Sequence, residues 1–240
     1  MVDNINAYEK KIQSQNGEDG ILEELFNRIG TTNKFFVEFG VEEGIECNTS
    51  YLSMYKQWSG VLIEGSTESY TRLVNNYKSK GLHQVVLVQD FITKENIDTL
   101  FKTNNVPTEL DLLSIDIDGN DYWVWKGLGD YKPRVVVIEY NACFPPPKKW
   151  VMQYNPTHNW NGTDYFGASL TSLTALGKQM GYGLLGTDSN GVNAFFLRKD
   201  LIQQSGFAEK TPEDAYNSLK YGWYNGKNEY PPGSGPFQEI

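Results

Sequence analysis

Short apolar, β-branched runs alternate with longer amphipathic segments along most of the chain, and this alternation restricts the possible folds more than any other feature. It is typical of parallel strands joined by crossover helices, because parallel neighbours need a connection long enough to cross one face of the sheet. The pattern predicts strands at residues 34–40, 60–65, 84–90, 110–118, 134–140, 182–187 and 193–198.

The segments between these strands carry helical patterns. Apolar residues recur at helical spacing over residues 19–29, and Ser66 is a favourable N-cap for a helix after the second strand. Residues 93–101 and 170–180 repeat the helical pattern. Five strand-helix units followed by a closing pair of strands predict an α/β fold with a doubly wound, Rossmann-like sheet of seven strands. The sheet is expected to be mostly parallel, since the last strand of the closing pair can insert antiparallel.

Two regions depart from this alternation. Residues 141–166 are rich in Pro, Trp, Asn and Tyr, and residues 221–240 form a tail rich in Gly, Pro and Tyr. A loop as long as the first is usually a lid or a binding segment, so we expect an insertion that covers the substrate, while the tail can be disordered. With no obvious linker in 240 residues, we expect one domain over residues 1–240.

The formal net charge of −9 opposes a nucleic-acid partner, since such proteins need a basic face to displace counterions. The longest apolar runs, such as residues 135–138, are far shorter than a membrane span, and the start of the chain lacks the pattern of a secretory leader. We therefore predict a cytoplasmic protein that binds neither nucleic acid nor membrane. The oligomeric state is left open, a homodimer included.

The first predicted strand ends in an acid-x-Gly-x-x-x-Gly turn made by Glu38, Gly40 and Gly44. Glycines in such a turn let the backbone approach a ligand closely. Glu42 and Glu43 would repel a phosphate group, so the turn suits a ligand with an ammonium and a sulfonium, as in S-adenosylmethionine. The alternative is a plain strand-to-helix turn with solvated glutamates.

The next two strands also end in acids. Glu64 stands near the spacing expected of a carboxylate that accepts hydrogen bonds from both ribose hydroxyls. Asp90 is placed to accept from an adenine amino group, with Phe91 beside the ring. Either carboxylate alone could be merely solvated, but three consecutive strands ending this way favour a nucleoside site.

The fourth and fifth strands bring further oxygen ligands to the same edge. Strand alternation places Asp116 and Asp118 on one face, and Glu139 and Asn141 end the following strand. Such crowded carboxylates need a proton, a cation or a hydrogen-bond network between them. Their oxygen atoms suit Mg²⁺ or Ca²⁺, which could lower the pKa of an acceptor hydroxyl.

A metal-free reaction is the alternative. The candidate catalytic residues are then Asp116 and Asp118 with His158, which lies inside the predicted insertion and has the ordinary pKa of a general base. A lone loop histidine can equally be structural.

These residues resemble those of the FkbM-like branch of class I S-adenosylmethionine-dependent methyltransferases, over residues 14–198. The resemblance rests on the stretch at residues 14–19, the glycine turn after the first strand, and the Ile-Asp-Ile-Asp-Gly strand end followed by Asp121. It implies that S-adenosylmethionine contacts Gln15, Glu38, Gly40, Gly44, Asn48, Glu64, Asp90, Phe91 and Asp116. Two departures are Glu42, where a further glycine is usual, and the aromatic, amide-rich stretch at 119–123.

The resemblance further implies O-methylation of a small hydroxylated acceptor, such as a sugar or sugar nucleotide used in surface-polysaccharide or natural-product biosynthesis. One alternative is an NAD-dependent oxidoreductase or epimerase, which the missing three-glycine fingerprint opposes. Another is a non-catalytic module that holds a glycan or a partner protein through the aromatic insertion.

Overall fold

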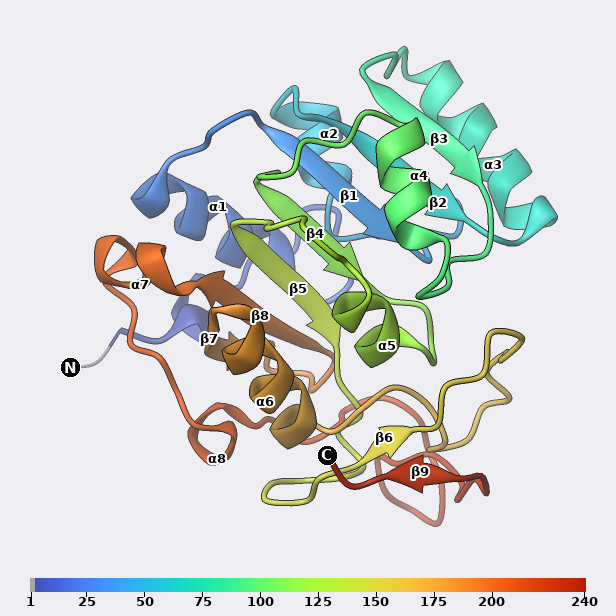
Figure 1. Cartoon of the computed structure of the whole chain (residues 1–240), viewed down its shortest axis with the longest axis vertical. Helices are drawn as coiled ribbons and strands as arrows, with labels where there is room; N and C mark the ends of the chain where they lie inside the picture. The colour runs from blue at the N-terminus through green and yellow to red at the C-terminus, as the bar shows by residue number, and fades with distance from the viewer. Residues whose placement is uncertain (1–2) are drawn as a thin grey trace.

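Seven strands form one sheet in the computed structural model, which describes residues 3–240 (Figure 1). The order is β3-β2-β1-β4-β5-β8-β7, in which the first five strands of the chain run parallel and β8 lies antiparallel between β5 and β7. The strands are β1 (Phe35–Phe39), β2 (Ser59–Glu64), β3 (Val85–Gln89), β4 (Leu112–Ile115), β5 (Val135–Glu139), β7 (Tyr182–Thr187) and β8 (Asn193–Arg198). The predicted doubly wound sheet and its antiparallel closing strand are confirmed.

Helices cover both faces of this sheet, because alternate strand residues bury apolar side chains on opposite sides. The helices α4 (Ile97–Thr103), α5 (Asp121–Lys126) and α6 (Leu170–Met180) cover one face. The other face is covered by α1 (Glu18–Ile29), α2 (Ser50–Tyr55), α3 (Thr67–Ser79) and α7 (Lys199–Ser205). A 3₁₀ turn, η1 (Ile5–Tyr8), precedes them, and a short α8 (Pro212–Ala215) follows.

The sequence predicted the long helices and missed the short ones. Ser66 caps α3 as expected, its hydroxyl accepting from the Ser69 N–H. The helix predicted from residue 93 begins four residues later, because Thr93 and Asn96 bond reciprocally to each other's backbone N–H and form a turn first. Helices α2 and α5 have only six residues each, too few to show a helical period.

The insertion after β5 and the C-terminal tail pack against each other (Figure 1). A two-stranded sheet joins β6 (Val151–Met152) to β9 (Phe237–Gln238). Trp150 lies between Phe144 and Phe237, with ring centroids 4.2 and 5.9 Å away. The tail is thus part of the structure that covers the carboxyl edge of the main sheet.

Among residues 3–240, no helix has the length and apolar character needed to cross a membrane.

Candidate active site

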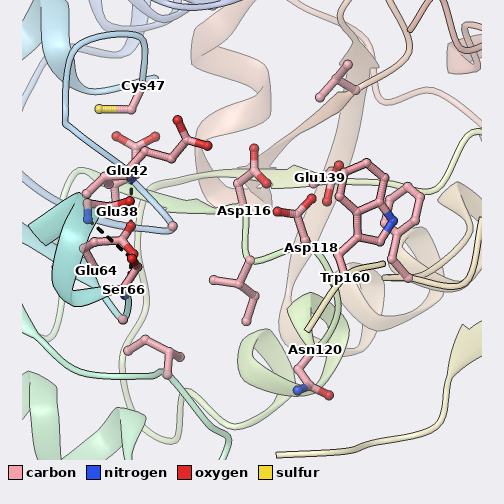
Figure 2. Close-up of a pocket in the computed structure, with 18 of the residues that line it drawn as sticks. Glu38, Glu42, Cys47, Glu64, Ser66, Asp116, Asp118, Asn120, Glu139 and Trp160 are labelled. Atoms are coloured by element: carbon pink, nitrogen blue, oxygen red, sulfur yellow. Dashed lines mark hydrogen bonds between the residues drawn. The ribbon is translucent and has the colours of Figure 1, made fainter. Parts of the chain in front are cut away.

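A cavity of about 640 Å³ lies at the carboxyl ends of β1, β2, β4 and β5, and residues of the insertion and the tail line one side of it (Figure 2). This is where ligands bind in open parallel sheets. Most predicted site residues line its wall: Gln15, Glu38, Gly40, Asn48, Glu64, Asp90, Phe91, Asp116, Asp118, Glu139 and His158. Gly44 and Asn141 are absent from the wall of this cavity.

Two sides of the cavity can be distinguished in Figure 2. What we call the β2 side carries Glu64. Asp90 and Phe91, in the loop after β3, lie beside it, since the Asp90 N–H donates to the Glu64 carbonyl and the Phe91 ring lies against Gly65. The insertion side carries Asp118 and Glu139 with aromatic residues of the insertion and the tail. Asp116 lies between the two sides.

Glu38 organises the turn after β1. Its buried carboxylate accepts the backbone N–H groups of Asn48 and Thr49 at 2.8 and 2.9 Å, together with the hydroxyls of Thr49 and Ser114. Burial raises the pKa of Glu38, while these hydrogen bonds act in the opposite direction. Both carboxylate oxygens are therefore engaged by the protein, and Glu38 positions the loop that faces the cavity.

The two glycines of this turn are needed for contacts within the protein. Both have positive φ, +66° at Gly40 and +71° at Gly44. A Cβ on Gly40 would overlap the carbonyl oxygen of Asp116, and one on Gly44 would overlap Leu73 and Tyr77 of α3. Gly40 lets the ends of β1 and β4 approach each other. Gly44, predicted to contact the cofactor, instead packs against a helix because the turn curls over α3.

Glu64 is held in place at the end of β2. One carboxylate oxygen accepts the Glu42 N–H at 2.8 Å and the other accepts the Ser66 N–H at 2.7 Å (Figure 2). Each oxygen keeps a second lone pair for a ligand. Across the β2 side, the Phe91 ring lies over Gly65 and remains 63% exposed, so it presents a free aromatic face.

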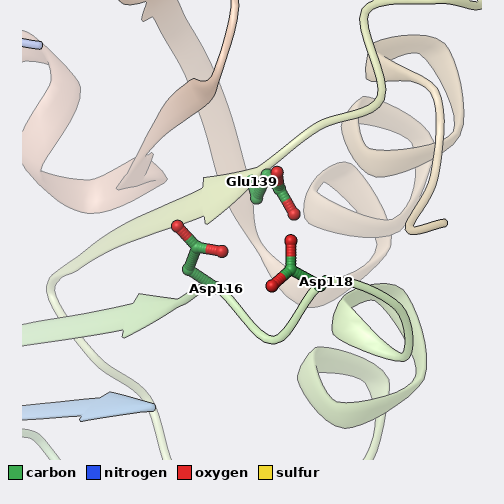
Figure 3. Close-up of side chains that lie close together, drawn as sticks. All are labelled: Asp116, Asp118 and Glu139. Atoms are coloured by element: carbon green, nitrogen blue, oxygen red, sulfur yellow. The ribbon is translucent and has the colours of Figure 1, made fainter. Parts of the chain in front are cut away.

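Three carboxylates meet beyond the end of β4 (Figure 3). Asp116, Asp118 and Glu139 each place an oxygen within 4.8 Å of the others. The predicted reason, strand alternation, is wrong, because β4 ends at Ile115 and both aspartates lie in the following loop. We call these three residues the carboxylate cluster.

The loop itself is shaped by Asp121. Its two carboxylate oxygens accept the N–H groups of Ile117 and Gly119, each at 2.9 Å. Asp118 between them adopts a left-handed backbone conformation with φ +53°. The resulting turn aims the Asp118 side chain back toward Asp116 and Glu139 (Figure 3).

The carboxylate cluster carries charge that the protein does not neutralise. Asp118 keeps part of its surface exposed, but desolvation of its carboxylate and then the charge of Asp121 raise its pKa to about 6. Desolvation and the cluster's own charges raise the pKa values of Asp116 and Glu139 well above their ordinary range. Within residues 3–240, no Lys, Arg or His forms an ion pair with these three residues, and Glu139 Oε2 has no hydrogen-bond partner. The cluster is therefore suited to bind protons or a cation. Three oxygen donors this close also fit a hard divalent ion such as Mg²⁺.

Asn141 does not join the carboxylate cluster. Its buried amide donates to the carbonyl oxygens of Asp164 and Phe166, both at 2.8 Å, and accepts the Cys143 N–H at 3.0 Å. Asn141 thus anchors the insertion and has no donor left for the cavity. The prediction that Asn141 is a metal ligand rested on its position at the end of a strand, and this position does not indicate that the amide turns toward the insertion.

His158 reaches the cavity from the insertion, as predicted. Its ring packs so tightly on Gly119 that a Cβ there would overlap it. Burial lowers the pKa of His158, although the Asp118 backbone acts in the opposite direction, and in the described chain its buried Nε2 has no hydrogen-bond partner. A neutral imidazole with a free nitrogen can accept a proton.

Three aromatic residues that the sequence did not single out complete the insertion side. Trp160, Phe166 and Tyr230 meet edge to face, with centroids 5.2 to 6.0 Å apart. Tyr230 lines the cavity, and burial, followed by the charges of Glu139 and Asp118, raises its pKa to about 12. The aromatic content of the insertion could have indicated that Trp160 and Phe166 line a site. The contact of Tyr230 with them could not be predicted, because it depends on how the tail folds back.

No protein-family model matches the sequence, and no curated protein matches it either. Similarity appears among solved structures. A Staphylococcus aureus protein assigned as a caffeoyl-CoA O-methyltransferase is 14% identical, with 78% of this chain and 85% of that chain covered and a TM-score of 0.52. The chain has the class I methyltransferase fold.

Two further structures are similar at lower scores. An S-adenosylmethionine-dependent methyltransferase from Clostridium acetobutylicum is 11% identical, with 75% and 89% of the two chains covered and a TM-score of 0.48. The N-terminal domain of EvdMO1, solved with S-adenosylhomocysteine (SAH) bound, is 17% identical, with 77% and 80% covered and a TM-score of 0.48.

Proposed function

We propose that this chain is an S-adenosylmethionine-dependent O-methyltransferase of the FkbM-like type, acting on a small hydroxylated acceptor. The observation that carries the proposal is the fixed Glu64 carboxylate, which faces the cavity of a class I methyltransferase fold and retains free lone pairs. It offers the ribose hydroxyls an acceptor that needs no rearrangement on binding.

The other residues of the β2 side suit the rest of the donor. Asp90 can accept from the adenine amino group, and the exposed Phe91 ring offers a face on which adenine can stack. Asp116, between the two sides, lies where it can meet the ammonium group of the methionine part. Gln15 and the Asn48 side chain line the same wall and add polar groups.

The reaction requires the acceptor oxygen, the methyl carbon and the sulfonium sulfur to lie in a line. Holding them so supplies most of the rate, because displacement reactions gain strongly from positioning. His158 is the residue we assign as general base, since burial favours the neutral ring and its buried Nε2, which has no hydrogen-bond partner within residues 3–240, can take a proton once the ring turns toward the acceptor. Asp118, whose pKa of about 6 leaves it mostly ionised at neutral pH, is the second candidate.

If Mg²⁺ is bound, Asp116, Asp118 and Glu139 would hold it, and it would supply a lower pKa for the acceptor hydroxyl. In either case the aromatic residues Trp160, Phe166 and Tyr230 line the insertion side.

A sugar is the acceptor class that fits the insertion side best. Sugars bind to aromatic faces and to carboxylate and amide oxygens, and both are present there. A sugar nucleotide fits less well, because no Lys or Arg of the described chain lines the cavity to receive its phosphates. Biosynthesis of a surface polysaccharide or a natural product remains the process we propose for such a product.

Calorimetry separates this function from its rivals. We expect S-adenosylmethionine and SAH to bind and NAD to give no heat, whereas an oxidoreductase would bind NAD and a glycan-binding module would bind neither. Glu64→Gln should weaken SAH binding by about tenfold or more, since charged acceptors hold hydroxyls more strongly than amides do. Glu213→Gln, at an exposed acid on α8, is the matched control and should bind SAH as the wild type does. Unchanged SAH affinity in Glu64→Gln would refute the assignment.

A further inference from the structure

The charged residues that line the cavity are all acidic. Among the described residues that line it, none is Lys or Arg, and nine are carboxylates: Glu38, Glu42, Glu43, Glu46, Glu64, Asp90, Asp116, Asp118 and Glu139. Glu43 and Glu46 pair at the rim with Arg72 and Lys11, at 3.6 and 3.4 Å. The carboxylate cluster has no such partner within residues 3–240, so any ligand that reaches it meets an uncompensated negative potential.

The methyl donor accounts for only part of this charge. Its adenosine belongs on the β2 side, and its ammonium and sulfonium groups can be met by Asp116 in the middle (Figure 2). Asp118 and Glu139 lie farther along, beside Trp160. Glu139 Oε2 is buried without a hydrogen-bond partner in the part of the chain described, an arrangement that costs free energy unless a ligand completes it.

The walls around these two carboxylates are aromatic. Trp160 and Tyr230 lie 5.2 Å apart, and Phe166 packs against both. Aromatic faces beside carboxylates recognise ammonium groups, since the ring quadrupole attracts a cation and the carboxylates neutralise it. The same rings and carboxylates could not neutralise the negative charge of a phosphate or of a sugar carboxylate.

We propose that the acceptor is a hydroxylated amine, such as an amino sugar, whose ammonium group binds between Asp118 and Glu139 against Trp160 and Tyr230. This inference rests on the proposed function and names its substrate class. It excludes sugar nucleotides and uronic acids, because their anionic groups would be desolvated among carboxylates with no counter-charge.

The same arrangement directs methylation to oxygen. An ammonium held by two carboxylates keeps its proton and has no lone pair with which to attack. A neighbouring hydroxyl does, and its oxygen forms the new C–O bond while the C–S bond breaks and its electron pair goes to sulfur. The hydroxyl proton passes to His158 Nε2, which leaves SAH and a methyl ether.

The test is calorimetry on the SAH-loaded protein near neutral pH, with glucosamine, glucose, glucose 6-phosphate and MgCl₂ as probes. We expect glucosamine to bind at least about tenfold more tightly than glucose, as a charge-assisted contact predicts, and glucose 6-phosphate to give no heat. Glu139→Gln should remove the preference for glucosamine, while Glu213→Gln should keep it. A glucosamine preference in the wild type that Glu139→Gln abolishes supports the proposal.

Three results would overturn it. The first is glucose or glucose 6-phosphate binding at least as tightly as glucosamine, and the second is no heat with any sugar. The third is Mg²⁺ binding that depends on Glu139 and that strengthens glucose binding, because the cluster's charge would then belong to a metal. The proposed function fails separately, by absence of SAH binding before any probe is added.

Discussion

His158 lies against Gly119 so closely that the imidazole occupies the space of a Gly119 side chain. The loop after β4 and the insertion after β5 are thereby fixed to each other beside the part of the cavity where we propose that the acceptor binds. The Gly119 N–H is also held by Asp121, so both partners of this contact are positioned.

We expect Gly119→Ala to displace His158 and to lower kcat by about 100-fold if His158 is the base, since loss of general-base catalysis costs that much or more. Gly119 does not have a positive φ, so alanine brings no backbone strain. His158→Ala should lower kcat similarly, and the double variant should be no slower than His158→Ala alone. SAH affinity, measured by calorimetry, should be unchanged in all three. Additive losses in the double variant would contradict the assignment.

The carboxylate cluster should lower the stability of the folded protein at neutral pH. The folded-state pKa of Asp118 is raised to about 6 from 3.8, so the folded protein binds this proton more tightly than the unfolded chain does. The resulting stability is present below pH 3.8 and is lost as pH rises through about 6. Burial raises the pKa values of Asp116 and Glu139 in the same direction.

Glu139→Gln should therefore raise the free energy of unfolding at neutral pH, by about 1 kcal/mol, because it removes a partly buried carboxyl group whose ionisation the neighbouring carboxylates oppose. The gain should shrink as the pH falls through about 6, where Asp118 takes up its proton and its repulsion of Glu139 falls. Urea unfolding of the wild type and the variant, at neutral pH and at a pH below about 6, measures the difference in free energy of unfolding. The contributions of the other titrating groups are the same in both proteins and cancel in this difference. A variant that is less stable than the wild type at neutral pH would show that the cluster is already neutralised.

Replacing Gly40 should destabilise the protein by steric overlap in addition to backbone strain. Gly81 serves as the control, because it has the same backbone conformation without the overlap. Both have φ near +67°, at +66° and +68°, but nothing lies within 4 Å of a Cβ on Gly81, whereas one on Gly40 overlaps the Asp116 carbonyl. Gly81→Ala should cost about 1 kcal/mol of backbone strain, and Gly40→Ala at least about 3 kcal/mol, measured by urea unfolding. Equal losses would mean that the ends of β1 and β4 can separate freely.

The sequence was enough to predict the sheet, because its strands are short apolar runs separated by longer amphipathic or polar segments. It also predicted that Glu64, Asp116, Asp118 and Glu139 share one edge, since parallel strands end together. It could not predict that Gly44 packs on α3 or that Asn141 turns into the insertion, because these depend on where loops fold back. The contribution of Tyr230 was equally hidden, since the tail meets the insertion through contacts between residues far apart in sequence, such as the pairing of β6 with β9 and the bond from the Asp164 N–H to the Pro231 carbonyl.

Tyr230 tests whether the tail takes part in acceptor binding. Tyr230→Ala removes a ring that packs on Trp160 and Phe166 beside the carboxylate cluster, so we expect the KM for the acceptor to rise by about tenfold, as loss of one aromatic contact predicts. SAH affinity should be unchanged, because the β2 side lies across the cavity. Trp223→Ala is the matched control, since this tail aromatic is 74% exposed and does not line the cavity. If both variants keep the wild-type KM, the tail only covers the site. If Tyr230→Ala also weakens SAH binding, the two sides of the cavity are not independent.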